Sequence, residues 1–394
     1  MKMTTNNIPQ GYKDSPLGSI PEEWEVKKLG EVCMFIKSGK NKEKSTEGLF
    51  RVFGSTGIIG FTNKYVYDCP LLLIARVGVN AGFIYYINEK CDISDNTLIL
   101  KLNSSYDFIF VYNQLKQYKL NRYIFGSGQP LITTSLLKSI KISFPSLPEQ
   151  QKIAEVLSTW DKAIEKQSQL IEKLELRKKG LMQQLLTGKK RLPEFSGEWK
   201  NIKLGDISKR ITRKNKKEEC SNVVTISAQK GFVRQTDFFN KKVASEKIEN
   251  YYLVNRNEFC YNKSYSNGFP MGTIKRLKEF DQAVVTTLYI CFAIQEEIVS
   301  IDFIEQYFSL GLLNRGLMKV ANEGGRAHGL LNVTPNDFFN IKLILPPYYE
   351  QMAISSILLN AQNEVVLAKR KLESLQEQKK GLMQVLLIGK KRLL

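Results

Sequence analysis

The stretch Lys178-Lys179-Gly180-Leu181-Met182-Gln183 decides the architecture, because it returns later in the chain as Lys379-Lys380-Gly381-Leu382-Met383-Gln384. It belongs to a longer repeat in which residues 149–192 align without a gap onto residues 350–393, shifted by 201. Nineteen of these 44 pairs are identical, which is too many for chance. A repeat of this period indicates that the chain consists of two similar halves, each a globular region followed by a long helix.

The beginning of each half also repeats, but at a different spacing. Residues 24–32, which begin Trp24-Glu25-Val26, match residues 199–207, which begin Trp199-Lys200-Asn201, at a shift of 175. The second half therefore carries 26 more residues between its beginning and its helix. Similar first and last segments around two different central segments suit a protein that recognises two different targets at a fixed separation.

Both repeated helices carry apolar residues at heptad spacing, interrupted in the first helix by Gln167 and Lys178. In the first helix the apolar positions are Ile153, Leu157, Trp160, Ile164, Ile171, Leu174, Leu181 and Leu185. In the second they are Ile354, Leu358, Ala361, Val365, Ala368, Leu372, Leu375, Leu382 and Leu386. This pattern is typical of a coiled-coil seam, and Gly188 and Gly389 are typical helix stops.

A helix of about 40 residues is about 60 Å long and must bury such a seam. The simplest closed arrangement pairs the two helices antiparallel, with pseudo-two-fold symmetry between the halves. In the alternative, each helix docks independently on its own globular region.

Further apolar residues widen the stripe at the basic end of each helix. They are Leu181, Met182, Leu185 and Leu186 in the first helix, and Leu382, Met383, Leu386 and Leu387 in the second. If exposed, such patches indicate a partner, and we expect them to bind other subunits, one per half. In the alternative, the chain's own globular regions bury them.

The globular regions read as mixed α/β structure without the alternation of a doubly wound sheet. In the first half we expect strands at 52–59, 71–75, 82–87, 97–102 and 140–144, and a helix at 106–118. In the second half we expect strands at 223–226, 258–261, 283–293 and 341–345, and a helix near 302–312. The predicted segments are a first globular region (1–148), a first long helix (149–192), a second globular region (193–346) and a second long helix (347–394).

The charge is unusual for a folded chain of this length: 58 Lys and Arg against 39 Asp and Glu give a net charge of +19. Such an excess indicates a polyanionic partner, most often nucleic acid. Six scattered cysteines and one histidine predict no zinc site and suit a reducing cytoplasm. The polar first residues and the lack of a long apolar run predict neither a signal peptide nor a membrane span.

Catalytic motifs are missing. The stretch Phe53-Gly54-Ser55-Thr56-Gly57 lacks the strand–loop–helix context of a cofactor loop, so no cofactor is expected. Leu345-Pro346-Pro347-Tyr348 resembles the active loop of adenine methyltransferases, but an apolar Leu345 cannot accept a hydrogen bond from the adenine amino group. No nucleophile–base set is visible, so no catalytic residue is predicted.

The loops instead offer side chains that read DNA, because Arg and Lys recognise guanine, Asn and Gln recognise adenine, and hydroxyls hold phosphates. Each alone could be a solvated turn, and the prediction rests on the set. In the first half the candidates are Ser55, Thr56, Lys64, Arg76, Asn80, Arg122 and Gln129. In the second they are Lys230, Arg234, Asn262, Lys263, Ser264, Tyr265, Arg276, Arg326 and His328.

The chain resembles the specificity subunits of type I restriction–modification systems over nearly its whole length. The resemblance rests on the Trp24 and Trp199 openings, on the stretch Phe144–Ala154 that leads into the first helix, and on the repeated helix ends. One departure lies at Tyr348-Tyr349, where the family favours leucine.

The resemblance implies two target recognition domains, each reading one half of a split site in double-stranded DNA. It also implies two methyltransferase subunits that bind S-adenosylmethionine and methylate adenine, and a motor nuclease subunit that joins them. The specificity chain itself would be non-catalytic. Two other functions stay open: a DNA-binding or DNA-bridging protein that works alone, and a self-contained adenine methyltransferase.

Overall fold

The computed structural model describes residues 8–42, 45–123, 131–236, 248–321 and 331–393. The chain divides into two compact units, and neither is continuous along the sequence. Unit 1 contains residues 1–169 and 369–394, and unit 2 contains residues 170–368. Each unit therefore combines one globular region with one end of each long helix.

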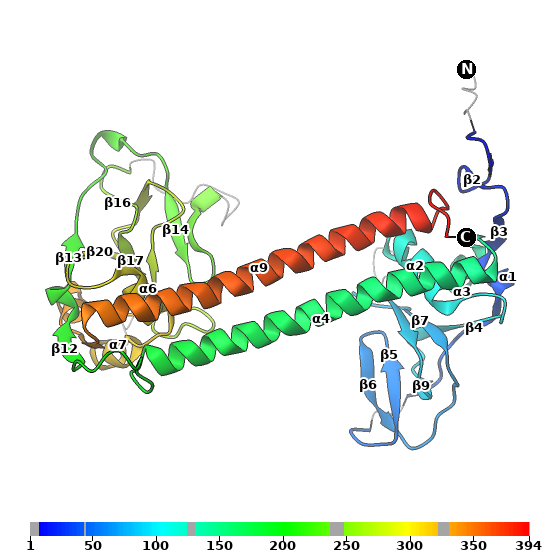
Figure 1. Ribbon diagram of the computed structural model, residues 1–394, viewed down its shortest axis with the longest axis horizontal. Coiled ribbons are helices and arrows are strands. Elements are labelled where there is room, and N and C mark those ends of the chain that lie inside the picture. The colour runs from blue at the N-terminus through cyan, green and yellow to red at the C-terminus, as the bar shows by residue number, and fades with distance from the viewer. Residues whose placement is uncertain (1–7, 43–44, 124–130, 237–247, 322–330, 394) are drawn as a thin grey trace. The chain divides into compact units, whose positions relative to one another are not determined.

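Unit 1 is built on an antiparallel sheet with the strand order β4 (Cys33–Ser38), β10 (Thr97–Leu102), β7 (Leu71–Ala75) and β8 (Ile84–Ile87). Helix α2 (Phe108–Tyr118) packs against β7 and β8 (Figure 1). A smaller sheet joins β6 (Gly57–Thr62), β5 (Phe50–Gly54) and β9 (Cys91–Ile93). The other elements are β1 (Tyr12–Lys13), β2 (Ile20–Pro21), β3 (Glu25–Lys28), α1 (Leu29–Val32), η1 (Leu120–Tyr123), α3 (Thr134–Ser139) and β11 (Lys141–Phe144).

Unit 2 repeats this plan with different loops. Its four-stranded antiparallel sheet has the order β13 (Ser208–Ile211), β20 (Ile290–Ile294), β17 (Phe259–Asn262) and β18 (Thr273–Arg276), and α6 (Ile301–Ser309) packs on β18. Three strand pairs accompany it: β12 (Lys200–Lys203) with β21 (Lys342–Leu345), β14 (Val224–Ser227) with β15 (Gly231–Arg234), and β16 (Tyr252–Asn255) with β19 (Gln282–Val285). The short helices of unit 2 that lie wholly within the described residues are η2 (Leu204–Asp206), η3 (Lys216–Glu218), α7 (Asn314–Val320) and α8 (Pro335–Phe339).

The long helices are α4 (Leu147–Leu185) and α9 (Tyr348–Leu386). None of the predicted seam residues is exposed: each is buried or half-buried. Each helix stops before a glycine in the left-handed region, with φ of 70° at Gly188 and 73° at Gly389, as the repeat predicts. The regular helices thus end a few residues before the predicted boundaries at residues 192 and 394.

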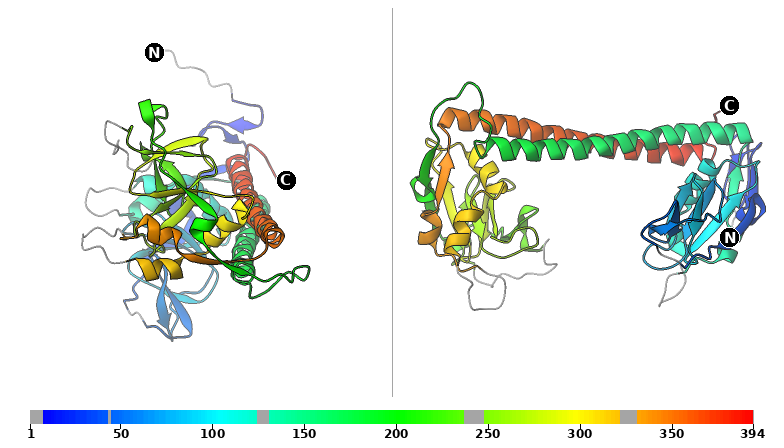
Figure 2. Two further views of the ribbon diagram at one scale, coloured as in Figure 1. Left: turned by 90° about the vertical axis from the view of Figure 1, so that its left-hand side faces the viewer. Right: turned by 90° about the horizontal axis from the view of Figure 1, so that it is seen from below.

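In each unit a stretch of α4 lies beside a stretch of α9 and runs in the opposite direction (Figure 2). In unit 1 the Lys379 ammonium donates to the Asp161 carboxylate at 2.6 Å, and Arg392 clamps buried Glu149 at 2.7 and 2.9 Å. The matched positions in unit 2 make the matched contacts. There Lys178 donates to Gln362, and Arg191 clamps buried Glu350 at 2.6 and 2.7 Å.

A repeated glutamine ties each long helix to its globular region. The side chain of Gln150 accepts from the backbone N–H of Asp107, the N-cap of α2, and donates to the Pro145 carbonyl. In unit 2 Gln351 does the same with the backbone N–H of Ser300, the N-cap of α6, and the carbonyl of Pro346. The glutamine of the repeated Glu-Gln pair therefore anchors each long helix to its globular region.

Several predicted elements are confirmed and two need correction. Strands β7 and β10 have the predicted bounds, and α2 begins after its cap Asp107 rather than at Tyr106. The single strand predicted at 52–59 is instead a hairpin, because Gly57 adopts a φ of 96° and turns the chain between β5 and β6. The strand predicted at 283–293 is likewise two strands, β19 and β20, which pair with different partners.

Candidate nucleic-acid interface

A polar cleft of about 470 Å³ opens in unit 2 between the β14–β15 turn and the segment that follows β17. Hydroxyl and amide side chains from both segments line it: Thr225, Ser227, Gln229, Asn262, Ser264, Ser266, Asn267, Thr273 and Tyr289. Two of these, Asn262 and Ser264, are predicted DNA-binding residues. None of the described residues that line the cleft is acidic, so none of them repels a phosphate.

Asn262 organises one wall of the cleft. Its amide donates to the Ile226 carbonyl at 3.1 Å, which joins β17 to β14. Its carbonyl oxygen accepts from the Ser264 backbone N–H at 3.0 Å and closes a turn that presents Ser264 and Tyr265. Tyr265 is 61% exposed and is free to stack on a base, whereas Asn262 is already engaged. Asn262 is therefore a positioning residue for the cleft.

The floor of the cleft carries a pair of hydroxyls. Thr225 Oγ1 and Tyr289 Oη lie 3.1 Å apart, and burial raises the pKa of the Tyr289 phenol. Tyr289 therefore stays neutral and keeps a proton that it can donate. Burial also lowers the pKa of Lys263, which is half-buried beside the cleft.

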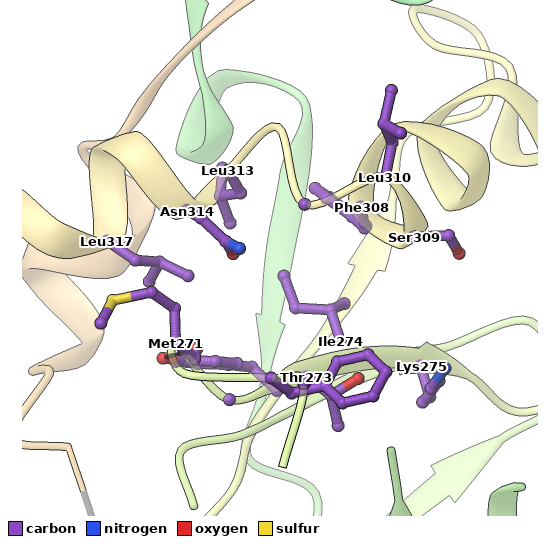
Figure 3. Close-up of a pocket in the computed structure, with 15 residues that line it drawn as sticks. Met271, Thr273, Ile274, Lys275, Phe308, Ser309, Leu310, Leu313, Asn314 and Leu317 are labelled. Atoms are coloured by element: carbon purple, nitrogen blue, oxygen red, sulfur yellow. Dashed lines mark hydrogen bonds between the residues drawn. The ribbon is translucent and has the colours of Figure 1, made fainter. Parts of the chain in front are cut away.

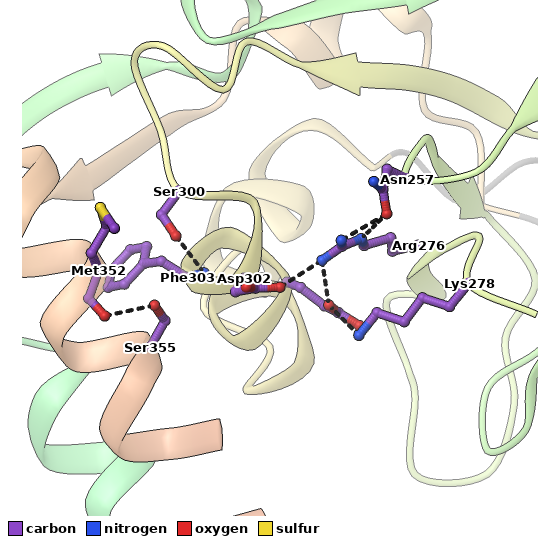
Figure 4. Close-up of polar contacts among 9 residues, drawn as sticks. Asn257, Arg276, Lys278, Ser300, Asp302, Phe303, Met352 and Ser355 are labelled. Carbon is purple, nitrogen blue, oxygen red and sulfur yellow. Dashed lines mark hydrogen bonds and ion pairs between the residues drawn. The ribbon is translucent and has the colours of Figure 1, made fainter. Parts of the chain in front are cut away.

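The prediction that Arg276 reads DNA needs correction (Figure 4). Its side chain is only 11% exposed and donates to Asp302 at 2.7 Å and to Glu305 at 3.3 Å. Its Nε and Nη2 also donate to Asn257 at 3.0 and 2.7 Å. With its donors occupied by the protein, Arg276 joins β18 to α6 and is not available to a base.

The predicted basic residues Lys230 and Arg234 belong to the β14–β15 hairpin, and both are exposed. The Lys230 backbone N–H donates to Ser227 Oγ, which shapes the turn at the edge of the cleft. The Arg234 guanidinium lies 5.6 Å from the centre of the Phe280 ring. These cations can contact phosphate without giving up an ion pair.

A second, smaller cavity of about 130 Å³ lies between β18 and the α6–α7 segment (Figure 3). None of the predicted DNA-binding residues lines it. Gly272 beside it has a φ of 71°, and a Cβ there would lie 2.3 Å from the Asn262 carbonyl oxygen. Glycine at this position lets the β17–β18 loop fold back on Asn262, and the small cavity belongs to that packing.

In unit 1 the predicted readers Ser55 and Thr56 form the tip of the β5–β6 hairpin. The Tyr85 hydroxyl donates to the Ser55 carbonyl at 3.3 Å and ties the tip to β8. Lys64 is exposed just beyond β6. The tip of this hairpin presents hydroxyls, and Lys64 adds an exposed cation beside it.

Arg76, Asn80 and Arg122 belong to neighbouring segments of unit 1. The Arg76 carbonyl accepts from the Ile132 backbone N–H, and the Phe83 backbone N–H bonds back to Asn80. Gly82 has a φ of 87°, and a Cβ there would lie 2.8 Å from the Asn121 backbone nitrogen. The loop after β7 therefore packs on η1, which brings the Asn80 loop beside the segment that carries Arg122.

Three predicted readers, Gln129, Arg326 and His328, lie outside the described residues. In contrast, the cleft includes Ser227 and Gln229, which are absent from the predicted set of sites, together with Ser266 and Asn267 of the polar run after β17. The run of small polar residues after β14 is the only signal for the first two, because nothing local shows that β14 and β17 share one cleft.

The predicted subunit-binding stripe needs correction too. Met182, Leu185 and Leu186 are buried in the core of unit 2, and Leu181 packs against it. Leu386 and Leu387 are buried in the core of unit 1, and Leu382 and Met383 pack against it. The structure shows the alternative arrangement, in which the chain's own globular regions cover the stripe. These residues therefore do not form an exposed apolar surface for another subunit.

No group of three or more His, Cys, Asp or Glu side chains within the described ranges is arranged to hold a metal ion. Within the same ranges, no helix is long and apolar enough to cross a membrane.

Residues 21–176 match the family model described as the type I restriction modification DNA specificity domain. The type I restriction enzyme MjaVIII specificity subunit of Methanocaldococcus jannaschii is 24% identical and aligns over 97% of this chain and 96% of its own. Residues 21–176 therefore match a type I restriction–modification DNA specificity domain, and the whole chain is similar to specificity subunits of type I systems.

Two solved structures share the fold. The S subunit of a type I system from M. genitalium superposes with a TM-score of 0.60 at 18% identity, covering 98% of both chains. A chain from a study of complex assembly and conformational transition in a type I system gives 0.54 at 15% identity, covering 94% of this chain and 99% of that one.

Proposed function

We propose that the chain is the DNA-recognition subunit that reads a split, asymmetric site in double-stranded DNA, one half with each unit. The match of residues 21–176 to a DNA specificity domain carries this proposal. The net charge of +19 and the polar cleft of unit 2 support it. Because the loops of the two units differ, the two half-sites should differ as well.

In this proposal α4 and α9 form an antiparallel coiled coil that sets the spacing between the half-sites. Each helix has 39 residues and lacks a break, and a seam of buried or half-buried residues follows each one. Two readers on one face of DNA must sit about one turn, or ~34 Å, apart. A rigid coil is suited to hold that distance.

We further propose that two methyltransferase subunits dock on the chain and methylate adenine, with S-adenosylmethionine bound to them, and that a motor nuclease joins through them. The chain itself would then be non-catalytic. Its likeness to a protein studied for type I complex assembly supports docking.

The self-contained methyltransferase is the weaker alternative. Leu345 is 1% exposed at the end of β21, and the Pro346 carbonyl accepts from Gln351, so this loop starts α9. The third possibility, a DNA-binding protein that acts alone, predicts specific binding without any partner.

The test is methylome sequencing of cells that express the cognate methyltransferase subunit with and without this chain. A split, asymmetric adenine motif that appears only with the chain supports the proposal. If no motif appears although the partner is expressed and bound, the stand-alone binder is the better explanation.

A further inference from the structure

A groove of about 690 Å³ lies beside the end of α4 in unit 2. Helix α7 forms one wall, and the β12–β21 pair forms the other; Figure 1 labels α7 and β12. Gly316 allows this arrangement, because a Cβ there would lie 2.3 Å from Ile341 Cγ2. The groove is thus built by close packing of α7 on the strand pair.

The lining of the groove is apolar inside and basic at its edge. The apolar lining includes Leu186, Trp199, Tyr307, Leu312, Val320, Ile341 and Ile344. Ile344 is 52% exposed on β21, so the groove presents an aliphatic side chain to solvent. Arg315, Lys319 and Lys342 are the lining cations, and all three are exposed. Among the described lining residues one is acidic, Asp337, and its carboxylate accepts from Thr334 Oγ1 at 2.6 Å.

The matched face of unit 1 has different chemistry. Ile344 pairs with Asn201 across β21 and β12, whereas the equivalent pair across β11 and β3 is Ser143 with Val26. Ser143 is 5% exposed, and Trp24, the equivalent of Trp199, is fully buried. An exposed aliphatic residue at this place is therefore a property of the second half only.

We propose that this groove docks an acidic amphipathic helix of the methyltransferase subunit, and that this contact exists for one of the two bound copies. The proposal rests on the proposed function, because it requires that methyltransferase subunits dock. The apolar floor favours the apolar stripe of a helix, and the three exposed cations favour acidic residues beside that stripe. A groove of this size suits an apolar side chain that inserts into it. Its apolar inner lining offers no cation to a phosphate backbone.

Because only one copy makes this contact, altering the groove should weaken the binding of that copy and leave the binding of the other copy unchanged. The test uses the full chain with the double substitution Arg315→Glu and Lys319→Glu, and separately with Ile344→Ser. These are exposed positions, so the fold should tolerate them. The matched control is Lys209→Glu with Arg210→Glu, which makes the same charge change at exposed positions of β13 away from the groove.

Each chain is co-expressed with its cognate methyltransferase subunit, and native mass spectrometry records the stoichiometry over a dilution series. We expect two methyltransferase copies on the original and control chains. Both groove variants should lose one copy on dilution, with a dissociation constant for that copy raised at least tenfold. The other copy should remain bound.

Several outcomes overturn the groove proposal. It is wrong if both copies bind the variants as they bind the original chain, or if both copies are lost together. It is also wrong if only DNA affinity and its salt dependence fall, since the groove would then bind phosphate, or if the variants only separate a dimer of this chain. If the original chain binds no methyltransferase and adds no motif to the methylome, the proposed function fails instead.

Discussion

At the scale of single residues, the structure separates cations that hold the fold from cations that are free to meet DNA. Arg276 donates to three side chains and is nearly buried, whereas the Arg234 guanidinium lies over the Phe280 ring and its side chain is exposed. Both look alike in the sequence, as basic residues in polar surroundings. Their environments predict opposite effects of substitution.

Arg276→Ala should lower the free energy of unfolding by about 1–3 kcal/mol, because it removes the charged hydrogen bonds to Asp302 and Glu305, of which Glu305 alone keeps a second cation, Lys278. Denaturant unfolding measures this. The control Arg234→Ala should change stability by less than about 0.5 kcal/mol and should weaken DNA binding. Equal stabilities for the two variants would contradict the structural role of Arg276.

Gln229 and Asn267 line the cleft of unit 2 and can read base edges. Gln229→Ala and Asn267→Ala should each reduce the discrimination between bases in one block of the methylated motif, by about 1–3 kcal/mol per base. The other block should stay unchanged. Lys64→Ala in unit 1 should weaken binding to all sequences and reduce the salt slope by about 1. Methylome sequencing and salt titrations check both. A change in both blocks would contradict separate reading by the two units.

The cysteines provide an independent check of burial. All six are free, and burial raises the pKa of Cys33 and Cys91 to about 12. At pH 8 these thiols stay protonated and shielded, and Cys220, Cys260 and Cys291 are buried as well. A thiol reagent should therefore modify Cys69 fast and the other five only after unfolding. Fast reaction of two or more thiols in the native protein would contradict the described cores.

At the scale of elements, the repeated helices are fastened to the globular regions by the same few polar contacts. Gln150 and Gln351 each hold the first turn of another helix and the carbonyl before their own helix. Their burial at 2% exposure leaves each amide no alternative partner in water. The repeat therefore preserves two kinds of position at the same spacing in both helices: the apolar seam and the hydrogen-bonding glutamine.

Gln351→Ala should lower the free energy of unfolding by about 1–3 kcal/mol, because the Ser300 N–H and the Pro346 carbonyl both lose a buried partner. Gln150→Ala should have a similar effect through unit 1. Gln378→Ala is the matched control, since exposed Gln378 bonds only to Ser374 of its own helix. Thermal unfolding compares the three. If Gln351→Ala were as stable as the control, the hydrogen bonds of Gln351 would not contribute to stability.

At the scale of the whole molecule, the proposed coil acts as a spacer between two readers. Inserting one heptad at matched positions of α4 and α9 preserves the seam and adds about 10 Å, at ~1.5 Å per residue. The unread gap of the motif should then lengthen by about 3 bp, at ~3.4 Å per base pair, with both blocks unchanged. Methylome sequencing reads this directly. New blocks at the old spacing would contradict the spacer.

The sequence by itself determined the features that depend on repetition and local pattern. These are the two halves, the positions of both long helices, their glycine stops, several strands, and the resemblance to specificity subunits. Such features are visible because helix periodicity and capping are properties of neighbouring residues. The basic composition and the missing catalytic motifs likewise needed no structure.

Only the tertiary structure decided which side chains are free to bind. Met182 and Leu387 look like docking residues in the sequence, but each lies in a core formed with segments distant in sequence. Arg276 looks like a DNA reader, but Asp302 and Glu305 of α6 occupy its donors. The cleft around Gln229 and the groove at Ile344 likewise form between segments far apart in the chain, and burial depends on those long-range contacts, which no local pattern specifies.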